Sequence, residues 1–120
     1  MSTLQVIRGD SAEWEFAVLK ADGTVQPLTG ETVALRWMAK AKADDLDSAA
    51  KLTATTANGK CVITDATGGL CEVRLSPADT DTLVPGVLLW DLQIRDAAGK
   101  VWTVADGKLL VVADISRTVP

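Results

Sequence analysis

The sequence of 120 residues contains no histidine, no tyrosine and only two cysteines. Without histidine there is no Ser-His-Asp or Cys-His nucleophile system, no imidazole metal ligand and no ordinary general base with a pKa near neutrality. Basic residues are also in the minority, since 12 Lys and Arg stand against 16 Asp and Glu. A protein that binds the nucleic-acid backbone needs a basic field. We therefore expect no enzyme activity, no cofactor, no metal site and no nucleic-acid partner.

Segments that target a chain to a membrane are also missing. The first eight residues lack a basic region followed by an apolar run, so no secretory signal is visible. The densest apolar stretch, residues 84–90, is far shorter than the roughly 18 residues of a spanning helix and contains Pro85-Gly86. Two cysteines do not make a disulfide framework in a chain of this length. We expect a single domain, residues 1–120, that folds in a reducing cytoplasm and has no membrane partner.

The sequence does contain many short segments of alternating polarity. Trp14, Phe16 and Val18 alternate with Glu13 and Glu15, which is the period of two that a half-buried strand requires. Further strands are predicted at residues 4–8, 33–39, 52–55, 60–65, 70–76, 86–95, 100–105 and 109–112. Turn signals recur roughly every 8–12 residues, which is typical of an all-β sandwich or barrel. We expect about eight or nine strands, all antiparallel because the connections are too short for crossover helices.

The connections between these strands carry their own signals. Asp22-Gly23, residues 66–69, residues 97–99 and Asp106-Gly107 are predicted turns. The last of these leads into residues 109–112, which are uniformly apolar and predict a central strand. Ser76 followed by Pro77 and Asp79 predicts one helical turn. Residues 39–51 are rich in alanine and charge, which indicates either a solvated loop or one short helix.

The acidic residues offer two candidate sites, neither of them specific. The run Asp44-Asp45-Leu46-Asp47 contains the carboxylates that calcium prefers, but it lacks the glycine turn and the distal glutamate of an EF-hand loop. We interpret it as a solvated loop balanced by Lys40, Lys42 and Lys51. A hydrolase with paired carboxylates is a second possibility. No spacing among the 16 acids selects one pair.

Cys61 and Cys71 lie symmetrically about Ala66. A hairpin centred on Ala66 places the two cysteines directly opposite each other, near the distance of a disulfide. A shift of one residue per strand instead pairs Cys71 with Ile63. We favour two reduced cysteines that act as small core residues. Two thiolates without histidine do not suffice for a metal site.

Three of the four tryptophans are predicted core residues, because Trp14, Trp37 and Trp90 fall on the apolar faces of their strands. Trp102 is ambiguous. It shares a face with Val104, and either face of that strand is compatible with burial.

An exposed Trp102 is a candidate interface anchor, because aromatic side chains concentrate binding energy in protein interfaces. The same ring is also a candidate platform for a sugar. The residues that follow the last strand offer a second candidate interface, which consists of Ile115, Arg117 and Val119.

A series of short motifs follows in order along nearly the whole chain. They are Ile7-Arg8-Gly9-Asp10, Ala21-Asp22-Gly23, Leu28-Thr29-Gly30, Ile63-Thr64-Asp65, Leu75-Ser76-Pro77-Ala78-Asp79-Thr80, Pro85-Gly86 before Trp90-Asp91-Leu92-Gln93, Asp106-Gly107-Lys108-Leu109 and Val112-Ala113-Asp114-Ile115-Ser116. In this series the chain resembles a group of small phage virion domains, typified by the N-terminal domain of the phage baseplate upper protein family. Physically the motifs are turn and cap residues, so they speak for a shared fold more than for a shared role.

The resemblance implies an immunoglobulin-like antiparallel β-sandwich that serves as a non-enzymatic assembly module in a phage tail, baseplate or head. Its partners would be other virion proteins in a homo-oligomer or symmetric assembly, and the protein would reach the virion after synthesis in the host cytoplasm. The bridging cysteines and tyrosine corner of true immunoglobulin domains are missing. Family members continue into a coiled coil or receptor-binding part, so an end at Pro120 favours a small adaptor or decoration protein. The alternative is a carbohydrate- or host-surface-binding module that uses Trp102 and loop acids.

Overall fold

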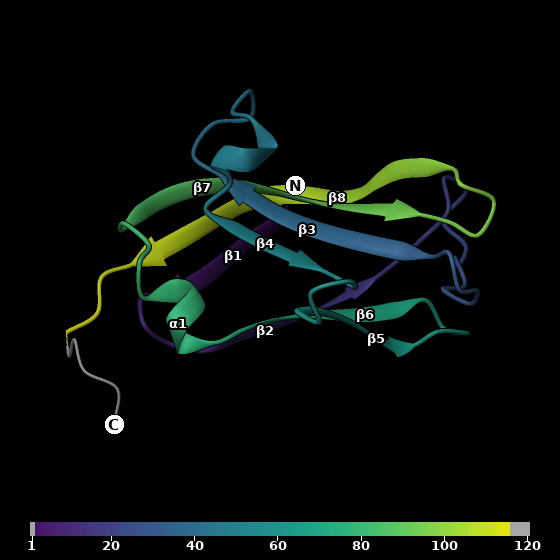
Figure 1. Cartoon of the computed structure of the whole chain (residues 1–120), viewed down its shortest axis with the longest axis horizontal. Helices are drawn as coiled ribbons and strands as arrows, with labels where there is room; N and C mark the ends of the chain where they lie inside the picture. Colours follow the sequence, from purple (N-terminus) through teal and green to yellow (C-terminus); the bar gives the residue numbers. More distant parts are fainter. Residues whose placement is uncertain (1, 116–120) are drawn as a thin grey trace.

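Two facing β-sheets make up the computed structural model, which describes residues 2–115 (Figure 1). The larger sheet has the strand order β1-β8-β7-β3-β4 and the smaller one the order β2-β6-β5. The strands are β1 Ser2–Ile7, β2 Ala12–Ala17, β3 Ala34–Lys40, β4 Leu52–Thr55, β5 Cys61–Asp65, β6 Leu70–Leu75, β7 Gly86–Arg95 and β8 Val101–Val112. Two sheets that face each other in this way form a β-sandwich. The expected all-β sandwich is confirmed.

The core lies between the sheets and is built from the alternation seen in the sequence. In β7, Leu88, Trp90, Leu92 and Ile94 are buried, while the residues between them face outward. The ring of Trp37 in β3 lies 6.4 Å from that of Trp90 and 5.5 Å from that of Trp14. Phe16 of β2 reaches across the core to Trp90, with ring centroids 5.4 Å apart. Trp37 and Trp90 are buried core residues, as predicted, and Trp14 is half-buried and packs against them. Each aromatic pair adds about 0.5–1.5 kcal/mol to the area that it buries.

The predicted turn at Asp106-Gly107 is wrong, because β8 continues through these residues to Val112. Val104 is an extra residue in β8 that has no counterpart on β7, so the strand contains a β-bulge. The bulge changes which residues face inward. Trp102 packs against the core before it, and Leu109 and Val111 pack against the core after it. A bulge therefore produces the change of phase that suggested two separate strands.

The expectation that every strand pairs antiparallel is also wrong, because β1 runs parallel to β8. The expectation rested on the short connections between consecutive strands. β1 and β8 come from opposite ends of the chain and have no connection of their own, so its length does not limit their direction. After β1 the chain turns at Gly9 and enters the smaller sheet as β2, and it returns to pair with β1 only in β8.

The cysteine register follows the shifted alternative. Cys61 pairs with Val73 and Cys71 pairs with Ile63. The directly opposed arrangement is wrong because the hairpin, which pairs Asp65 with Leu70, is centred beyond Ala66. Both thiols are free and buried on the core side of the smaller sheet. A hydrogen bond between them raises the pKa of Cys71 well above its usual range and lowers the pKa of Cys61.

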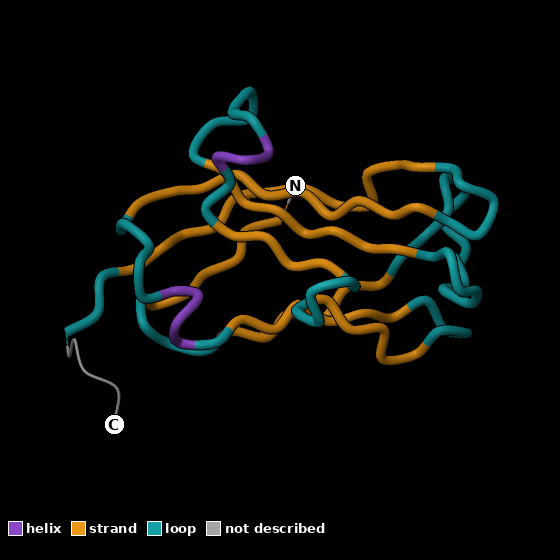
Figure 2. The backbone as a smooth tube through the Cα atoms, viewed as in Figure 1, coloured by secondary structure: helices purple, strands orange, loops and turns teal. Residues whose placement is uncertain are grey.

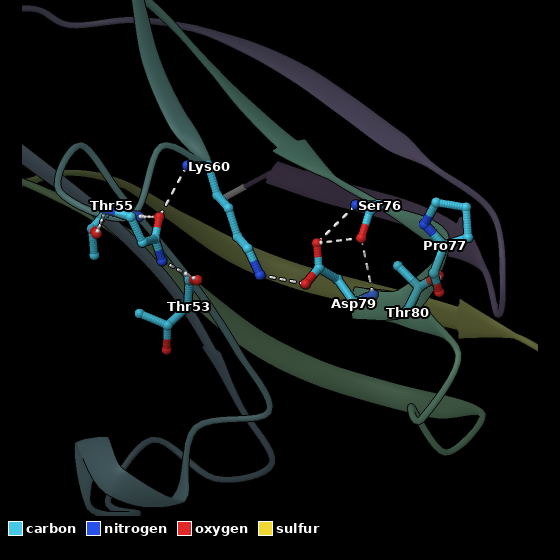
Figure 3. Close-up of polar contacts among 8 residues, drawn as sticks. Thr53, Thr55, Lys60, Ser76, Pro77, Asp79 and Thr80 are labelled. Atoms are coloured by element: carbon cyan, nitrogen blue, oxygen red, sulfur yellow. Dashed lines mark hydrogen bonds and ion pairs between the residues drawn. The ribbon is translucent and has the colours of Figure 1, made fainter.

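Two short helices lie outside the sheets (Figure 2). The 3-10 helix η1, Asp47–Ala49, sits in the charged segment between β3 and β4, so that segment is a loop with one short helical turn. The helix α1, Pro77–Thr80, has the predicted cap: Ser76 accepts a hydrogen bond from the Asp79 N–H, and the Asp79 carboxylate accepts one from the Ser76 N–H. Lys60 donates to the same carboxylate (Figure 3). Neither of these helices is long and apolar enough to cross a membrane.

We predict that two glycines with similar backbone angles differ in their tolerance of alanine. Gly23 and Gly69 both have positive φ, +87° and +69°. A β-carbon at Gly23 meets nothing within 4 Å, whereas one at Gly69 lies 2.7 Å from the Gln26 carbonyl oxygen and 3.1 Å from that of Val18. Gly23→Ala should lower the free energy of unfolding by about 1–2 kcal/mol, which is the cost of the left-handed conformation. Gly69→Ala should cost about 1–3 kcal/mol more because of the overlap.

Urea unfolding followed by tryptophan fluorescence measures both values. Equal losses in the two variants would contradict the close approach of Val18 and Gln26 to the β5–β6 turn.

Candidate functional site

The surface of the five-stranded sheet that points away from the smaller sheet, here called the outer face, carries an exposed apolar group at one end. Val87 is 53% exposed, Ile7 is 41% exposed and Val112 is 38% exposed. Val87 pairs with the half-buried Leu110, and Ile7 pairs with Val112. These four side chains from β1, β7 and β8 form what we call the apolar end. Most exposed hydrophobic residues occur singly on protein surfaces, so a group on three adjacent strands marks a candidate contact surface.

The other part of the outer face is charged and lies under residues 41–51, here called the covering loop, which project above β3 and β7 in Figure 1. Asp47 fastens this loop to the sheet. Its carboxylate lies 2.6 Å from Nζ of Lys40 and 3.4 Å from a guanidinium nitrogen of Arg36. The hydrogen bond from Lys40 lowers the pKa of Asp47. Met38, although it points outward, is only 7% exposed.

The acidic run of the covering loop thus engages basic side chains of β3. Lys40 was a predicted partner and Arg36 was not, while the Asp45 carboxylate accepts a hydrogen bond from the Lys42 backbone. Across residues 2–115 there is no group of three or more Cys, Asp or Glu side chains placed to hold a metal ion. Asp47 therefore acts in the structure as the anchor of the loop.

A hollow of about 310 Å³ lies beside the covering loop, and it contains two acids. Asp91 and Asp106 are direct cross-strand partners on β7 and β8. Burial raises the pKa of Asp91; the charges of Asp47 and Asp106 add to the effect, and Arg36 and Lys40 oppose it. Two acids also line each of two other hollows, namely Asp10 with Glu13 and Asp22 with Asp96, so the structure does not single out one pair for the hydrolase alternative. The sequence gave no signal for the pairing of Asp91 with Asp106, because the bulge in β8 decides which residue of β8 lies opposite Asp91.

Trp102 lines a second hollow, of about 410 Å³, at the opposite end of the sandwich from α1. We call it the loop-end depression. Its polar lining comes from the β2–β3 connection and the β7–β8 hairpin, namely Lys20, Asp22, Gln26, Asp96 and Lys100. The Trp102 ring is half-buried against the core, and Nζ of Lys100 lies 5.7 Å from its centroid. Trp102 is therefore placed between the two predicted roles, since part of the ring is packed and part lines the depression.

The candidate interface after the last strand is only partly described. Ile115 is fully exposed, whereas Arg117 and Val119 lie outside the described residues. The preceding residue, Asp114, is held by Arg8, whose Nε lies 2.9 Å from its carboxylate in a mostly buried ion pair. Ile115 thus projects into solvent directly after an anchored position.

Comparisons with known proteins assign no family to the chain. No protein-family model matches the sequence, and neither does any curated protein. The resemblance to phage virion domains therefore stays a prediction.

Sequence reasoning missed the apolar end. Its signal was present in the uniformly apolar runs of β7 and β8, in which Val87, Leu110 and Val112 occupy the phase opposite to the core residues. We interpreted the run 109–112 as a central strand, which is correct in that β8 lies between β1 and β7. The inference that such a strand is covered on both sides does not hold at this end of the sheet.

Two aspartates beside the covering loop should respond oppositely to loss of charge. Burial raises the pKa of Asp91 in the folded chain, so its charged form destabilises the fold at neutral pH. Asp91→Asn should therefore raise the melting temperature at pH 7. The pKa of Asp47 is lowered by Lys40, so Asp47→Asn should reduce the melting temperature at pH 7. The Asp91→Asn difference should fade as the pH falls below the usual aspartate pKa of about 3.9. The Asp47→Asn difference should persist to lower pH, because it is lost only as the pH falls through the lowered folded-state pKa of Asp47.

Calorimetry of the three proteins between pH 3 and pH 8 provides the comparison. A lower melting temperature for Asp91→Asn at pH 7 would show that the Asp91 carboxylate makes a stabilising contact.

Proposed function

We propose that the chain is a non-enzymatic structural protein of a tailed bacteriophage virion. It acts as an adaptor or decoration module of the tail, baseplate or head through protein–protein contacts. The observation that carries the proposal is the apolar end, where Ile7, Val87 and Val112 are exposed on adjacent strands. Surfaces of this kind mark sites of protein interaction.

The arrangement of the resemblance motifs supports the same proposal. The hydroxyl of Thr80, which is buried, accepts a hydrogen bond from the Gly9 N–H at 3.0 Å and donates to the Asp10 carbonyl at 2.8 Å. Arg8 binds Asp114. Three motifs that are far apart in the sequence therefore meet at one end of the sandwich. Their residues depend on each other there, so the series is better explained by a shared fold than by independent turns.

The virion assignment predicts a fixed location. Antibodies raised against the purified chain should label particles of the phage that encodes it at one defined position, seen by electron microscopy. Peptides of the chain should also appear in mass spectra of purified particles at a copy number that is a multiple of the local symmetry. Particles that lack the protein altogether would rule out the structural role.

The loop-end depression supports a second candidate, a carbohydrate-binding module. A sugar ring presents an apolar C–H face and polar hydroxyls. The Trp102 ring would pack against the C–H face of the sugar. The carboxylates of Asp22 and Asp96 would accept hydrogen bonds from its hydroxyls, and the Gln26 amide would accept or donate them. Of five hollows on the described part of the chain, this depression alone is lined by an aromatic ring together with charges of both signs and an amide.

Glycan binding by the isolated chain tests this candidate. Binding on a glycan array should fall at least tenfold in Trp102→Ala and survive in Trp102→Phe, which keeps an aromatic face. Val101→Ala, on the other side of the same strand, serves as the control. If no glycan on the array binds, or if Trp102→Ala binds as well as the native chain, the depression is not a sugar site.

A further inference from the structure

The edges of the two sheets differ in how they are protected. An edge strand exposes unpaired N–H and C=O groups, which are a template for pairing with another strand. The described sheets have four such edges: β1 and β4 in the larger sheet, and β2 and β5 in the smaller one. Proteins normally block edges with charge, bulges, short strands or covering side chains.

The edge of β4 is blocked by a side chain. Asn58 Oδ1 accepts a hydrogen bond from the Thr55 N–H at 2.9 Å, and Asn58 Nδ2 donates to the Thr53 carbonyl at 3.1 Å. Figure 3 shows Thr53 and Thr55 with these bonds. The backbone N–H and C=O of Ala54, which lies between these two threonines, point to β3. The backbone groups of Thr53 and Thr55 therefore point away from the sheet, toward the open edge. The Asn58 amide therefore occupies the positions that an added strand would need.

Both edges of the smaller sheet are blocked in other ways. β2 carries Glu13 and Glu15, which are exposed. If a second copy of β2 paired antiparallel with the first, Glu13 of each copy would lie opposite Glu15 of the other, and like charges that face each other across strands are unfavourable. β5 is interrupted by the irregularity between Ile63 and Asp65 and ends in the charged, exposed Asp65.

β1 lacks the charge, the bulge and the blocking side chain that protect the other edges. Its six residues include no charge and no proline, and its register with β8 is unbroken. Arg8 donates its N–H to the Val112 carbonyl, so the backbone groups of every second residue point to β8. Those of Thr3, Gln5 and Ile7 point to the open side, where the Ile7 carbonyl already accepts a hydrogen bond from the Asp10 N–H. A groove of about 370 Å³ runs along this side, and it is lined by Gln5, Val6 and Ile7 of β1 and by residues 10–14. We call it the edge groove.

We propose that β1 pairs antiparallel with β1 of a second copy, about a two-fold axis at Gln5. The pairing joins the two larger sheets into one continuous sheet. In this register Gln5 faces Gln5 of the other copy, and Thr3 of each copy faces Ile7 of the other. This contact would supply one partner, a second copy of the chain, for the assembly role proposed above. Its biological purpose therefore rests on that proposed function. The particle experiments test the role, and the experiment below tests the contact alone.

The uncharged residues of β1 suit a second copy of the same strand as the occupant. Because β1 is uncharged, the two-fold arrangement places no like charges opposite each other, in contrast to β2. The threonine–isoleucine pairs are β-branched side chains that suit cross-strand contact. Each copy carries a net charge of −4, which opposes association over longer distance. Salt screens that repulsion, so the dimer should strengthen as salt is added. A basic strand from another protein would show the opposite dependence.

Analytical ultracentrifugation of the chain, with no residues added before Met1, tests the proposal. A single edge contact is small, so we expect a dissociation constant on the order of 0.1 mM. Between 10 µM and 1 mM the weight-average mass should rise from monomer toward dimer, and more so at 0.5 M than at 0.05 M NaCl. Mass that stays at the monomer value to 1 mM at both salt concentrations would overturn the proposal.

Proline substitutions locate the contact. Gln5→Pro removes an N–H that faces the open side, so it should abolish dimers while leaving the pairing with β8 intact. Thr53→Pro makes the same change on the edge that Asn58 blocks and should leave the dimer unchanged. Circular dichroism checks that both variants are folded. Equal dimerisation of Gln5→Pro and the native chain would show that the contact lies elsewhere, for example at the apolar end.

A charge pair tests the register without proline. Thr3→Lys and Ile7→Glu are made in separate chains, so that only a mixed dimer places Lys opposite Glu. The mixture should dimerise at least threefold more tightly than either variant alone. No preference for the mixed dimer would contradict the antiparallel register about Gln5.

Discussion

Four aromatic rings fill the space between two sheets of unequal width, and the other surfaces of the molecule follow from that packing. Trp37 and Trp90 from the five-stranded sheet meet Trp14 and Phe16 from the three-stranded one. The smaller sheet thus covers only the inner side of the larger one. The outer face of the five-stranded sheet must therefore be covered by the chain's own loop or left to solvent. Asp47 secures the covering loop over Met38, and the apolar end remains open.

A second set of contacts holds β1 against the sheet, although β1 has only one neighbouring strand. The buried hydroxyl of Thr80 bonds both Gly9 and Asp10, and Arg8 binds Asp114 beyond the end of β8. Leaving such buried groups unpaired costs about 1–3 kcal/mol each. The turn after β1 is therefore fixed at both sides. An edge strand that is anchored in this way loses little further conformational freedom when another strand pairs with it, which favours association.

The sequence was informative where one strand decides its own pattern and misleading where a partner decides it. The alternation in β3 and β7 predicted their core residues, because burial of one face sets the phase locally. In β8 the alternation of inward and outward residues shifts at Val104. From the sequence alone, a turn at Asp106-Gly107 and a β-bulge explain this shift equally well. The pairing of β7 with both of these residues decides for the bulge. The parallel direction of β1 and the Asp91–Asp106 pair likewise depend on the partner strand.

The two candidate contacts are adjacent, and Ile7 belongs to both. A two-fold axis perpendicular to the sheet keeps the outer faces of both copies on the same side. The proposed dimer would therefore present two apolar ends, each containing Val87 and Val112, toward one direction. Two linked sites bind a symmetric or repeating partner far more tightly than one site does, because the second contact becomes intramolecular. A weak edge contact would thus be enough for the proposed role: it would form where copies are concentrated, and it would leave the free chain largely monomeric in dilute solution.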